Sequence, residues 1–206
     1  AYGQGMEKVG IYTGSLSFSD ISLKLPLNTY LAFMVGGLVR RIGCKIRPYE
    51  RISGTADRVI KEGMDVLVEA FSGNLSKEKA VAEVVSRFEA IETIREGSVF
   101  RSDRQRPKVA IFGDLYARDN EVINQDLIHF IEEQRGEVIT TPYSSFVKMI
   151  ARPYLRKWFI EGHYLNVLSS KALYATATRL ERTYYEYFNR ILKEPPQAYD
   201  ESPQKI

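Results

Sequence analysis

The hydrophobic positions in the first hundred residues recur mainly at helical spacing. Apolar side chains return every three or four positions over residues 27–42, 53–71 and 76–94, which predicts a helix in each segment. Asn28 and Ser76 are suitable caps at helix starts, and Gly73 with Asn74 favours a helix end. The residues expected to face inward are Leu31, Met34, Val35, Leu38 and Ile42 in the first helix, Val59, Met64, Val66 and Leu67 in the second, and Val81, Val84, Val85, Phe88 and Ile91 in the third.

A continuous apolar run replaces the helical period after Pro107. Residues 108–112 are bounded by Pro107 and Gly113, as expected of a strand buried on both faces of a parallel sheet. Helical spacing returns over residues 120–135, and residues 137–140 are a second short strand. This order predicts a βαβ unit with a right-handed crossover. The side chains of its helix that are expected to face inward are Val122, Ile123, Leu127, Phe130 and Ile131.

Helical patterns return after Pro142, up to about Glu161 and again over residues 169–193. Residues 7–13 are a candidate edge strand or a tethered arm. We therefore divide the chain into a mainly helical region with a candidate N-terminal strand, residues 1–100, and an α/β region with long C-terminal helices, residues 101–206. The predicted fold class is α/β, a partial doubly wound, flavodoxin-like parallel sheet with extra helices. Since two or three strands are too few for a self-sufficient sheet, we expect a larger protein to supply more.

The composition is that of an ordinary globular protein, with 44% hydrophobic and 27% charged residues. No apolar run reaches the roughly 18 residues that a membrane helix needs, and the N-terminus has no basic segment followed by an apolar one. The net charge of +3 comes from scattered lysines and arginines, which does not favour a nucleic-acid surface. We expect a cytoplasmic protein whose partners include neither a membrane nor a nucleic acid.

The residue types that hold metals and cofactors are sparse. The single cysteine, Cys44, excludes an internal disulfide and any site built from several cysteines of this chain. His129 and His163 have no second ligand at metal-binding spacing, so we predict no metal site. The chain has neither the three spaced glycines of a dinucleotide-binding turn nor a phosphate-binding loop with Lys and Ser.

Polar residues gather after the first predicted strand, where a parallel sheet normally binds its ligand. The candidate binding residues there are Asp114, Tyr116, Arg118 and Asn120. Ser144 follows the second strand and is expected on the same rim. A structural alternative is that Asp119 or Asn120 caps the next helix while Arg118 pairs with Asp114.

A second candidate segment connects the first two predicted helices. Arg47 is suited to bidentate binding of a carboxylate or phosphate, with Glu50 or Asp57 holding it in place. The structural alternative is that Pro48 ends the preceding segment, Glu50 is a solvated loop charge and Asp57 stabilises the first turn of the second helix.

Three segments of the chain carry a family resemblance. They are residues 47–50 (RPYE) with Gly54 and Asp57, residues 107–120 (PKVAIFGDLYARDN) with Asn124, and residues 136–138 (GEV). Together they resemble the 2-hydroxyglutaryl-CoA dehydratase component D and benzoyl-CoA reductase family, most closely its large members associated with CoA-enzyme activases. The resemblance covers roughly residues 27–196.

The resemblance implies a piece of an iron-sulfur protein that handles acyl-CoA substrates by low-potential electron transfer. In the intact parent, a 2-hydroxyacyl-CoA dehydratase-type lyase or its activator, it implies a 4Fe-4S cluster. Since clusters of this kind are held by several cysteine thiolates, Cys44 alone cannot hold one, and we expect this chain to be inactive by itself and to carry no cofactor.

The implied partners are the rest of the parent or another dehydratase subunit, an ATP-dependent activator, and acyl-CoA. Two other functions remain open from the sequence: a non-enzymatic assembly or interaction module, and a small-nucleotide-binding domain.

Overall fold

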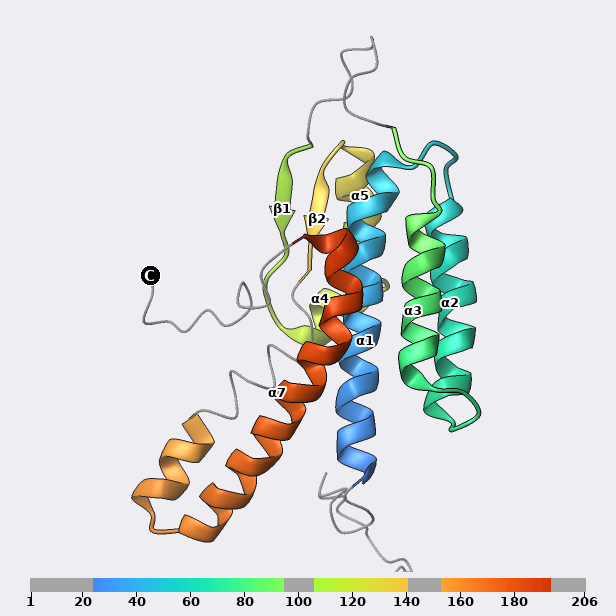
Figure 1. Ribbon diagram of the computed structural model, residues 1–206. Coiled ribbons are helices and arrows are strands. Elements are labelled where there is room, and N and C mark those ends of the chain that lie inside the picture. The colour runs from blue at the N-terminus through green and yellow to red at the C-terminus, as the bar shows by residue number, and fades with distance from the viewer. Residues whose placement is uncertain (1–23, 95–105, 141–152, 194–206) are drawn as a thin grey trace, which may run out of the picture.

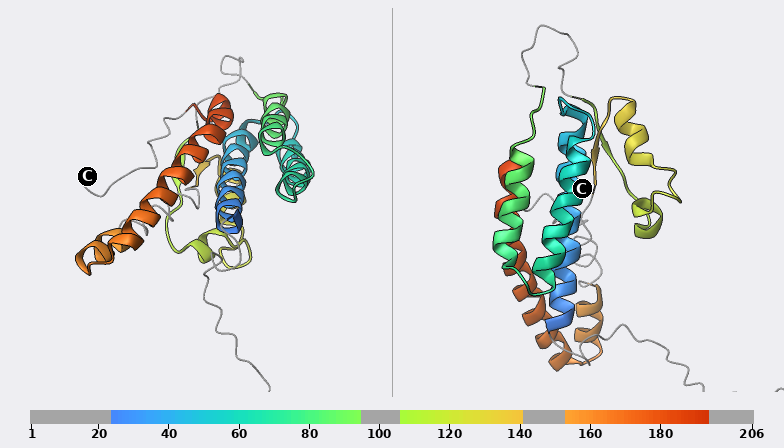
Figure 2. Two further views of the ribbon diagram at one scale, coloured as in Figure 1. Left: turned by 60° about the horizontal axis from the view of Figure 1, so that its bottom comes forward. Right: turned by 90° about the vertical axis from the view of Figure 1, so that its right-hand side faces the viewer.

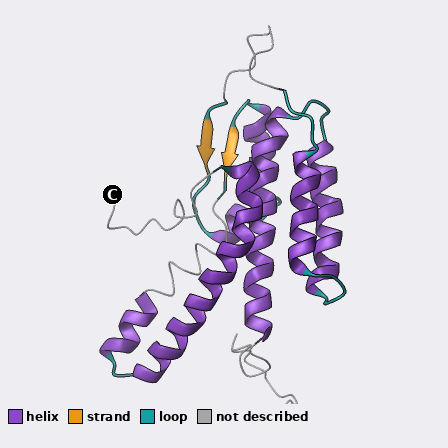
Figure 3. Ribbon diagram, viewed as in Figure 1, coloured by secondary structure: helices purple, strands orange, loops and turns teal. Residues whose placement is uncertain are grey.

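The computed structural model describes residues 24–94, 106–140 and 153–193, and these are mostly helical (Figures 1 and 3). The first described segment holds α1 (Lys24–Ile46), the short 3-10 helix η2 (Arg47–Tyr49), α2 (Thr55–Phe71) and α3 (Lys77–Glu89). The second holds β1 (Lys108–Ala110), α4 (Leu115–Asp119), α5 (Leu127–Glu133) and β2 (Glu137–Ile139). The third holds a helix over residues 153–160 and the long α7 (Tyr164–Leu192).

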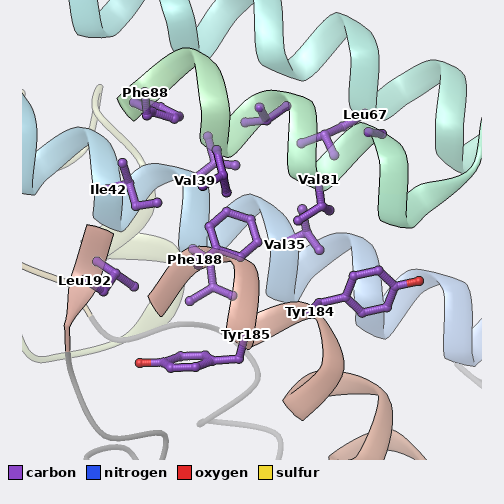
Figure 4. Packing of buried hydrophobic residues seen from close by; sticks show 14 of the residues in the cluster. Val35, Val39, Ile42, Leu67, Val81, Phe88, Tyr184, Tyr185, Phe188 and Leu192 are labelled. Atoms are coloured by element: carbon purple, nitrogen blue, oxygen red, sulfur yellow. The ribbon is translucent and has the colours of Figure 1, made fainter. Parts of the chain in front are cut away.

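The helices α1, α2, α3 and the C-terminal half of α7 pack around one hydrophobic core (Figure 4). α1 contributes Met34 and Leu38, α3 contributes Phe88, and α7 contributes Phe188 and Leu192, all almost inaccessible to solvent. The Lys45 ammonium also donates a hydrogen bond to the carbonyl of Leu192 at the end of α7. The first and last described segments are therefore parts of one bundle.

Most of the predicted inward positions of the three N-terminal helices are confirmed, including all five in α1 and all five from Val81 to Ile91. Met64 is the exception, since its side chain is exposed, and Val66 is only partly buried. The buried residues of α2 are Ala56, Val59, Gly63, Leu67 and Ala70, and a Cβ added at Gly63 would lie 3.1 Å from Val84 of α3. Gly63 thus permits a close approach between the two helices.

α1 is longer than predicted because Gly43 does not end it. A Cβ at Gly43 would lie only 2.6 Å from Cδ1 of Ile60 in α2, so this glycine makes room for a neighbouring helix. The helix continues to Ile46 and reaches the polar residues of the next turn.

β1 and β2 form a two-stranded parallel sheet, with Val109 opposite Val138. In the right-hand view of Figure 2 the sheet lies between α1 on one face and α4 and α5 on the other. A second hydrophobic cluster, formed by Cys44, Ile111, Ile128 and Val138, joins these layers. The predicted βαβ unit is therefore present, with two short helices in place of one.

The predicted flavodoxin-like, doubly wound sheet is wrong. Within the described residues the sheet has only two strands of three residues each, and helices dominate. The apolar residues of the first hundred positions recur at helical spacing and are used in a bundle core, which leaves few for further strands. The candidate strand at residues 7–13 and the predicted region boundary near residue 100 lie outside the described residues.

The helix predicted over residues 120–135 is wrong in its first half. Gln125 and Asp126 both have φ of 55°, which interrupts the helical backbone, and α5 begins only at Leu127. Because the helix starts later than predicted, a different set of side chains faces inward. Val122 and Phe130, which were expected inside, are exposed, and Ile128 is buried.

The side chain of Phe188 is fully buried where α7 meets the bundle, so we expect Phe188→Ala to lower the free energy of unfolding by about 3 to 5 kcal/mol. Phe112→Ala is the matched control because that ring is 80% exposed, and it should change stability by less than about 0.5 kcal/mol. Urea denaturation of both variants measures the difference, and equal losses would contradict the placement of α7.

Candidate functional site

The loop after β1 holds the candidate residues Asp114, Tyr116, Arg118 and Asn120. Asp114 caps α4, since its Oδ1 accepts hydrogen bonds from the backbone N–H groups of Tyr116 (3.0 Å) and Ala117 (3.2 Å). Asn120 caps the following turn in the same way, with Oδ1 accepting from the N–H groups of Val122 (3.0 Å) and Ile123 (3.1 Å). Both polar side chains therefore shape the loop. The ring of Tyr116 is 69% exposed.

Arg118 is buried and forms an ion pair with its neighbour Asp119. Its Nε lies 2.9 Å from Oδ1 and its Nη2 lies 3.1 Å from Oδ2 of that carboxylate. A second guanidinium, from Arg40 of α1, approaches Oδ1 of Asp119 at 2.9 Å. We call Arg40, Asp119 and Arg118 the arginine cluster. It joins two positive charges through one negative charge, so it carries an excess positive charge.

The arginine cluster differs from both interpretations of the sequence. Arg118 does not pair with Asp114, because that carboxylate is used as the cap of α4. Arg40 was not a predicted site residue, since sequence spacing does not reveal that α1 packs on the α/β unit. In the sequence, the only feature that could have marked Arg40 as a site residue was its position near the end of a predicted amphipathic helix.

The candidate residues Arg47 and Glu50 lie just beyond the C-terminal end of α1, further along the chain than Arg40, and they hold segments together. Nε of Arg47 lies 2.6 Å from Oε2 of Glu132 in α5, and its Nη1 pairs with Asp57 in α2. Glu50 accepts hydrogen bonds from the backbone N–H groups of Gly54 (2.6 Å) and Ala56 (2.7 Å), which fixes the start of α2. Glu50 is thus a helix cap, which neither interpretation of the sequence predicted.

Glu132 is a buried acid that sequence analysis did not identify. Burial raises its pKa, and the guanidinium of Arg47 only partly opposes this. Oε2 binds Arg47, whereas Oε1 has no hydrogen-bond partner among the described residues. A carboxylate in this setting depends on Arg47 to remain ionised inside the protein.

Cys44 lies next to this ion pair and is completely buried. Burial raises the pKa of its thiol to about 11, although Arg47 lies 3.9 Å from the sulfur and lowers it in part. The thiol therefore stays protonated at neutral pH, a form that is neither nucleophilic nor a metal ligand. Among the described residues no group of three acidic, histidine or cysteine side chains is arranged to hold a metal ion.

The candidate residues therefore do not converge on one site. Arg118 meets Arg40 through Asp119, and Arg47 binds Glu132 and Asp57. Asp114, Asn120 and Glu50 bind backbone N–H groups of their own segments. Ser144 lies outside the described residues. No helix in the described part of the chain is both long and apolar enough to cross a membrane. Comparison of the chain with protein-family models, with curated proteins and with solved structures found no match.

Removal of Arg47 leaves Glu132 buried without its cation, so Arg47→Met should lower the free energy of unfolding at pH 7 by about 3 kcal/mol. Because the pKa of Glu132 in the folded state is already raised, the variant gains most from protonation of this acid. Its deficit relative to the wild type should shrink as the pH falls toward 4.5, the ordinary value for glutamate.

Arg51→Met is the matched control for this test. Arg51 pairs with Glu92 at 3.1 Å, but both side chains are more than 70% exposed, so the change should be below about 1 kcal/mol at either pH. Urea unfolding at pH 7 and pH 5 measures both variants. A deficit in Arg47→Met that does not depend on pH would show that Glu132 is not the group left unpaired.

Proposed function

We propose that this chain is one module of a larger cytoplasmic acyl-CoA-handling protein of the 2-hydroxyacyl-CoA dehydratase type, and that it contributes a surface that binds the phosphates of coenzyme A. The proposal rests on the resemblance of residues 47–57 and 107–138 to that family. The observation that carries it to a site is the arginine cluster, in which Arg118 and Asp119 of α4, the helix that follows β1, meet Arg40 of α1.

The chemistry of the arginine cluster suits the phosphates of coenzyme A. Guanidinium groups have five N–H donors, and a shared carboxylate occupies only some of those on Arg40 and Arg118. The side chain of Arg40 is 28% accessible, so its remaining donors can meet a phosphate from solvent. Tyr116, two residues before Arg118 in α4, offers an exposed aromatic ring on which the adenine of coenzyme A can stack.

The residues of this chain do not fit the iron-sulfur cluster of the proposed parent. Such a cluster requires several thiolates, whereas the one thiol here is buried, has a raised pKa and contacts Arg47. The share of this chain in the proposed function is therefore binding and orientation of acyl-CoA, while the electron-transfer chemistry and its ATP-dependent activator belong to the rest of the parent.

A second candidate function is a non-enzymatic interaction module, which the open edge of β1 favours. Pro107 and Ile111 bond to β2, with Glu137 N–H to Pro107 O at 2.9 Å and Ile111 N–H to Ile139 O at 3.2 Å. Since backbone groups alternate along a strand, those of Lys108 and Ala110 point to the opposite edge, where the described residues place no strand. Backbone N–H and C=O groups along such an edge can pair with a strand of another polypeptide, so this edge suits an added strand.

Thermal unfolding with added ligand separates the two candidates and the small-nucleotide alternative. Coenzyme A at about 100 times its dissociation constant should stabilise the chain by about 2.7 kcal/mol, which corresponds to a rise in Tm of about 5 to 10 °C. AMP at the same concentration should give a smaller rise if the pantetheine and the additional phosphates contribute. An equal rise with AMP favours a nucleotide-binding domain, and no rise with either ligand favours the interaction module.

Arg40→Gln tests the arginine cluster directly. It removes the more accessible cation and keeps the Arg118–Asp119 pair, so it should weaken coenzyme A binding by about tenfold, the typical effect of a charge-assisted hydrogen bond. Arg87→Gln is the control, because Arg87 also joins two carboxylates, Glu62 and Glu83, but lies on α3. Calorimetric titration of the two variants should show a loss for Arg40→Gln alone, and equal affinities would refute the assigned site.

A further inference from the structure

The α/β unit, residues 106–140, has little hydrophobic core of its own. It consists of two strands of three residues each and of helices of five and seven residues. The buried hydrophobic side chains among its described residues are Ile111, Ile128 and Val138, and they share their cluster with Cys44 of α1. Elements this short are marginal in isolation, so the unit depends on its contact with α1 for stability.

The contact between the α/β unit and the bundle is mainly polar. Within the described residues, Cys44 is the one side chain of α1 in the hydrophobic cluster that joins the two parts. The other links are hydrogen bonds and ion pairs: Arg40 binds Asp119, Arg41 binds the Thr140 carbonyl, Arg47 binds Glu132 and Tyr49 binds Glu137. Small, polar contacts between two parts of a chain normally permit relative motion.

The bundle on the other side of α1 is held in a different way (Figure 2). Its helices share one continuous hydrophobic core, in which Met34, Phe88 and Phe188 are almost inaccessible to solvent. Burial of apolar surface is the dominant favourable term in folding, and a protein opens first where few apolar side chains are buried. We therefore expect the contact with the α/β unit to open more readily than the bundle.

We propose that the α/β unit undocks from α1 while the bundle stays folded, and that an acyl-CoA bound at the arginine cluster holds the unit docked. The cluster spans the contact, because Arg40 belongs to α1 whereas Arg118 and Asp119 belong to α4. It exists only in the docked form, so a ligand that needs both guanidinium groups favours that form. The second half of this inference rests on the proposed binding of coenzyme A, and the first half does not.

Cys44 reports the docking directly. It is the single cysteine of the chain, and it is completely buried between α1 and the α/β unit. Burial raises the pKa of its thiol to about 11, so in the docked form it is both inaccessible and protonated. The rate of its alkylation by iodoacetamide in the full chain therefore measures how often the unit undocks.

A thiol in the bundle core provides the reference rate. The double variant Cys44→Ala with Ala80→Cys moves the single thiol to a completely buried position of α3, which is accessible only when the bundle unfolds. We expect wild-type Cys44 to be alkylated more than about tenfold faster than this thiol, since local opening costs less free energy than global unfolding. Equal rates would show that Cys44 is exposed only by global unfolding, and would overturn the proposal.

Tyr49→Phe tests whether the opening occurs at this contact. It removes the hydroxyl that donates to Glu137 and accepts from the Arg106 N–H, so it should raise the alkylation rate of Cys44 by about tenfold. Tyr184→Phe is the matched control, because its hydroxyl also lies 2.9 Å from a carboxylate, that of Glu78, but joins α7 to α3 within the bundle. The control should leave the rate unchanged, and an equal increase in both variants would contradict local undocking.

Acetyl-CoA, which has no free thiol, tests whether a ligand holds the unit docked. At about 100 times the dissociation constant found by calorimetry, it should slow alkylation of Cys44 by up to about hundredfold, and Arg40→Gln should remove most of this effect. Binding without slower alkylation would overturn the holding role and leave the proposed function intact. Absence of binding would refute the proposed function and the holding role together, whereas the rates in Tyr49→Phe and Tyr184→Phe would still decide whether the unit undocks.

Discussion

The packing of α1 on both of its sides is the interaction on which the rest of the structure depends. One side buries Met34, Leu38 and Ile42 against α2, α3 and α7. The other side reaches the sheet, where Cys44 joins the second hydrophobic cluster and the Arg41 guanidinium donates a hydrogen bond of 2.9 Å to the Thr140 carbonyl. A single helix therefore links the bundle and the α/β unit, so a substitution that shifts α1 on one side also affects its packing on the other side.

Arginines carry much of this connection. Arg40, Arg41 and Arg47 extend from α1 and η2 to residues of the α/β unit that lie 79 to 99 positions later in the chain, namely Asp119, Thr140 and Glu132. A guanidinium that is buried loses its hydrogen bonds to water, and this desolvation cost offsets much of the energy of its new contacts. These contacts therefore specify how the two parts fit together more than they stabilise the fold. The same chemistry gives the arginine cluster its excess charge, and hence its proposed role in phosphate binding.

The helical half could be predicted from the sequence because its signals are local. The stripe from Val81 to Phe88 repeats at the helical period, and Ser76 caps α3 by accepting a hydrogen bond from the Lys79 N–H. The α/β half was predicted less well. The positive φ angles of Gln125 and Asp126 break the helix between β1 and β2, and the sequence has no glycine or proline there that would predict the break. The sheet could not be judged from apolar runs alone, since a short run fits a strand or a helix.

The candidate site shows the same division. The sequence by itself identified polar and charged residues at positions typical of binding sites. Asp114 and Arg118 follow a strand, and Arg47 and Glu50 lie in the turn between two helices. Only the tertiary structure decided what each one contacts. Asp114 and Glu50 cap helices. Arg47 pairs with Glu132, and Arg118 and Arg40 both bind Asp119. The local spacing of apolar residues determines whether a residue lies in a helix or a strand and which face it occupies. Its contacts depend on which helices and strands pack together, and this packing is set by side chains that are distant in the sequence.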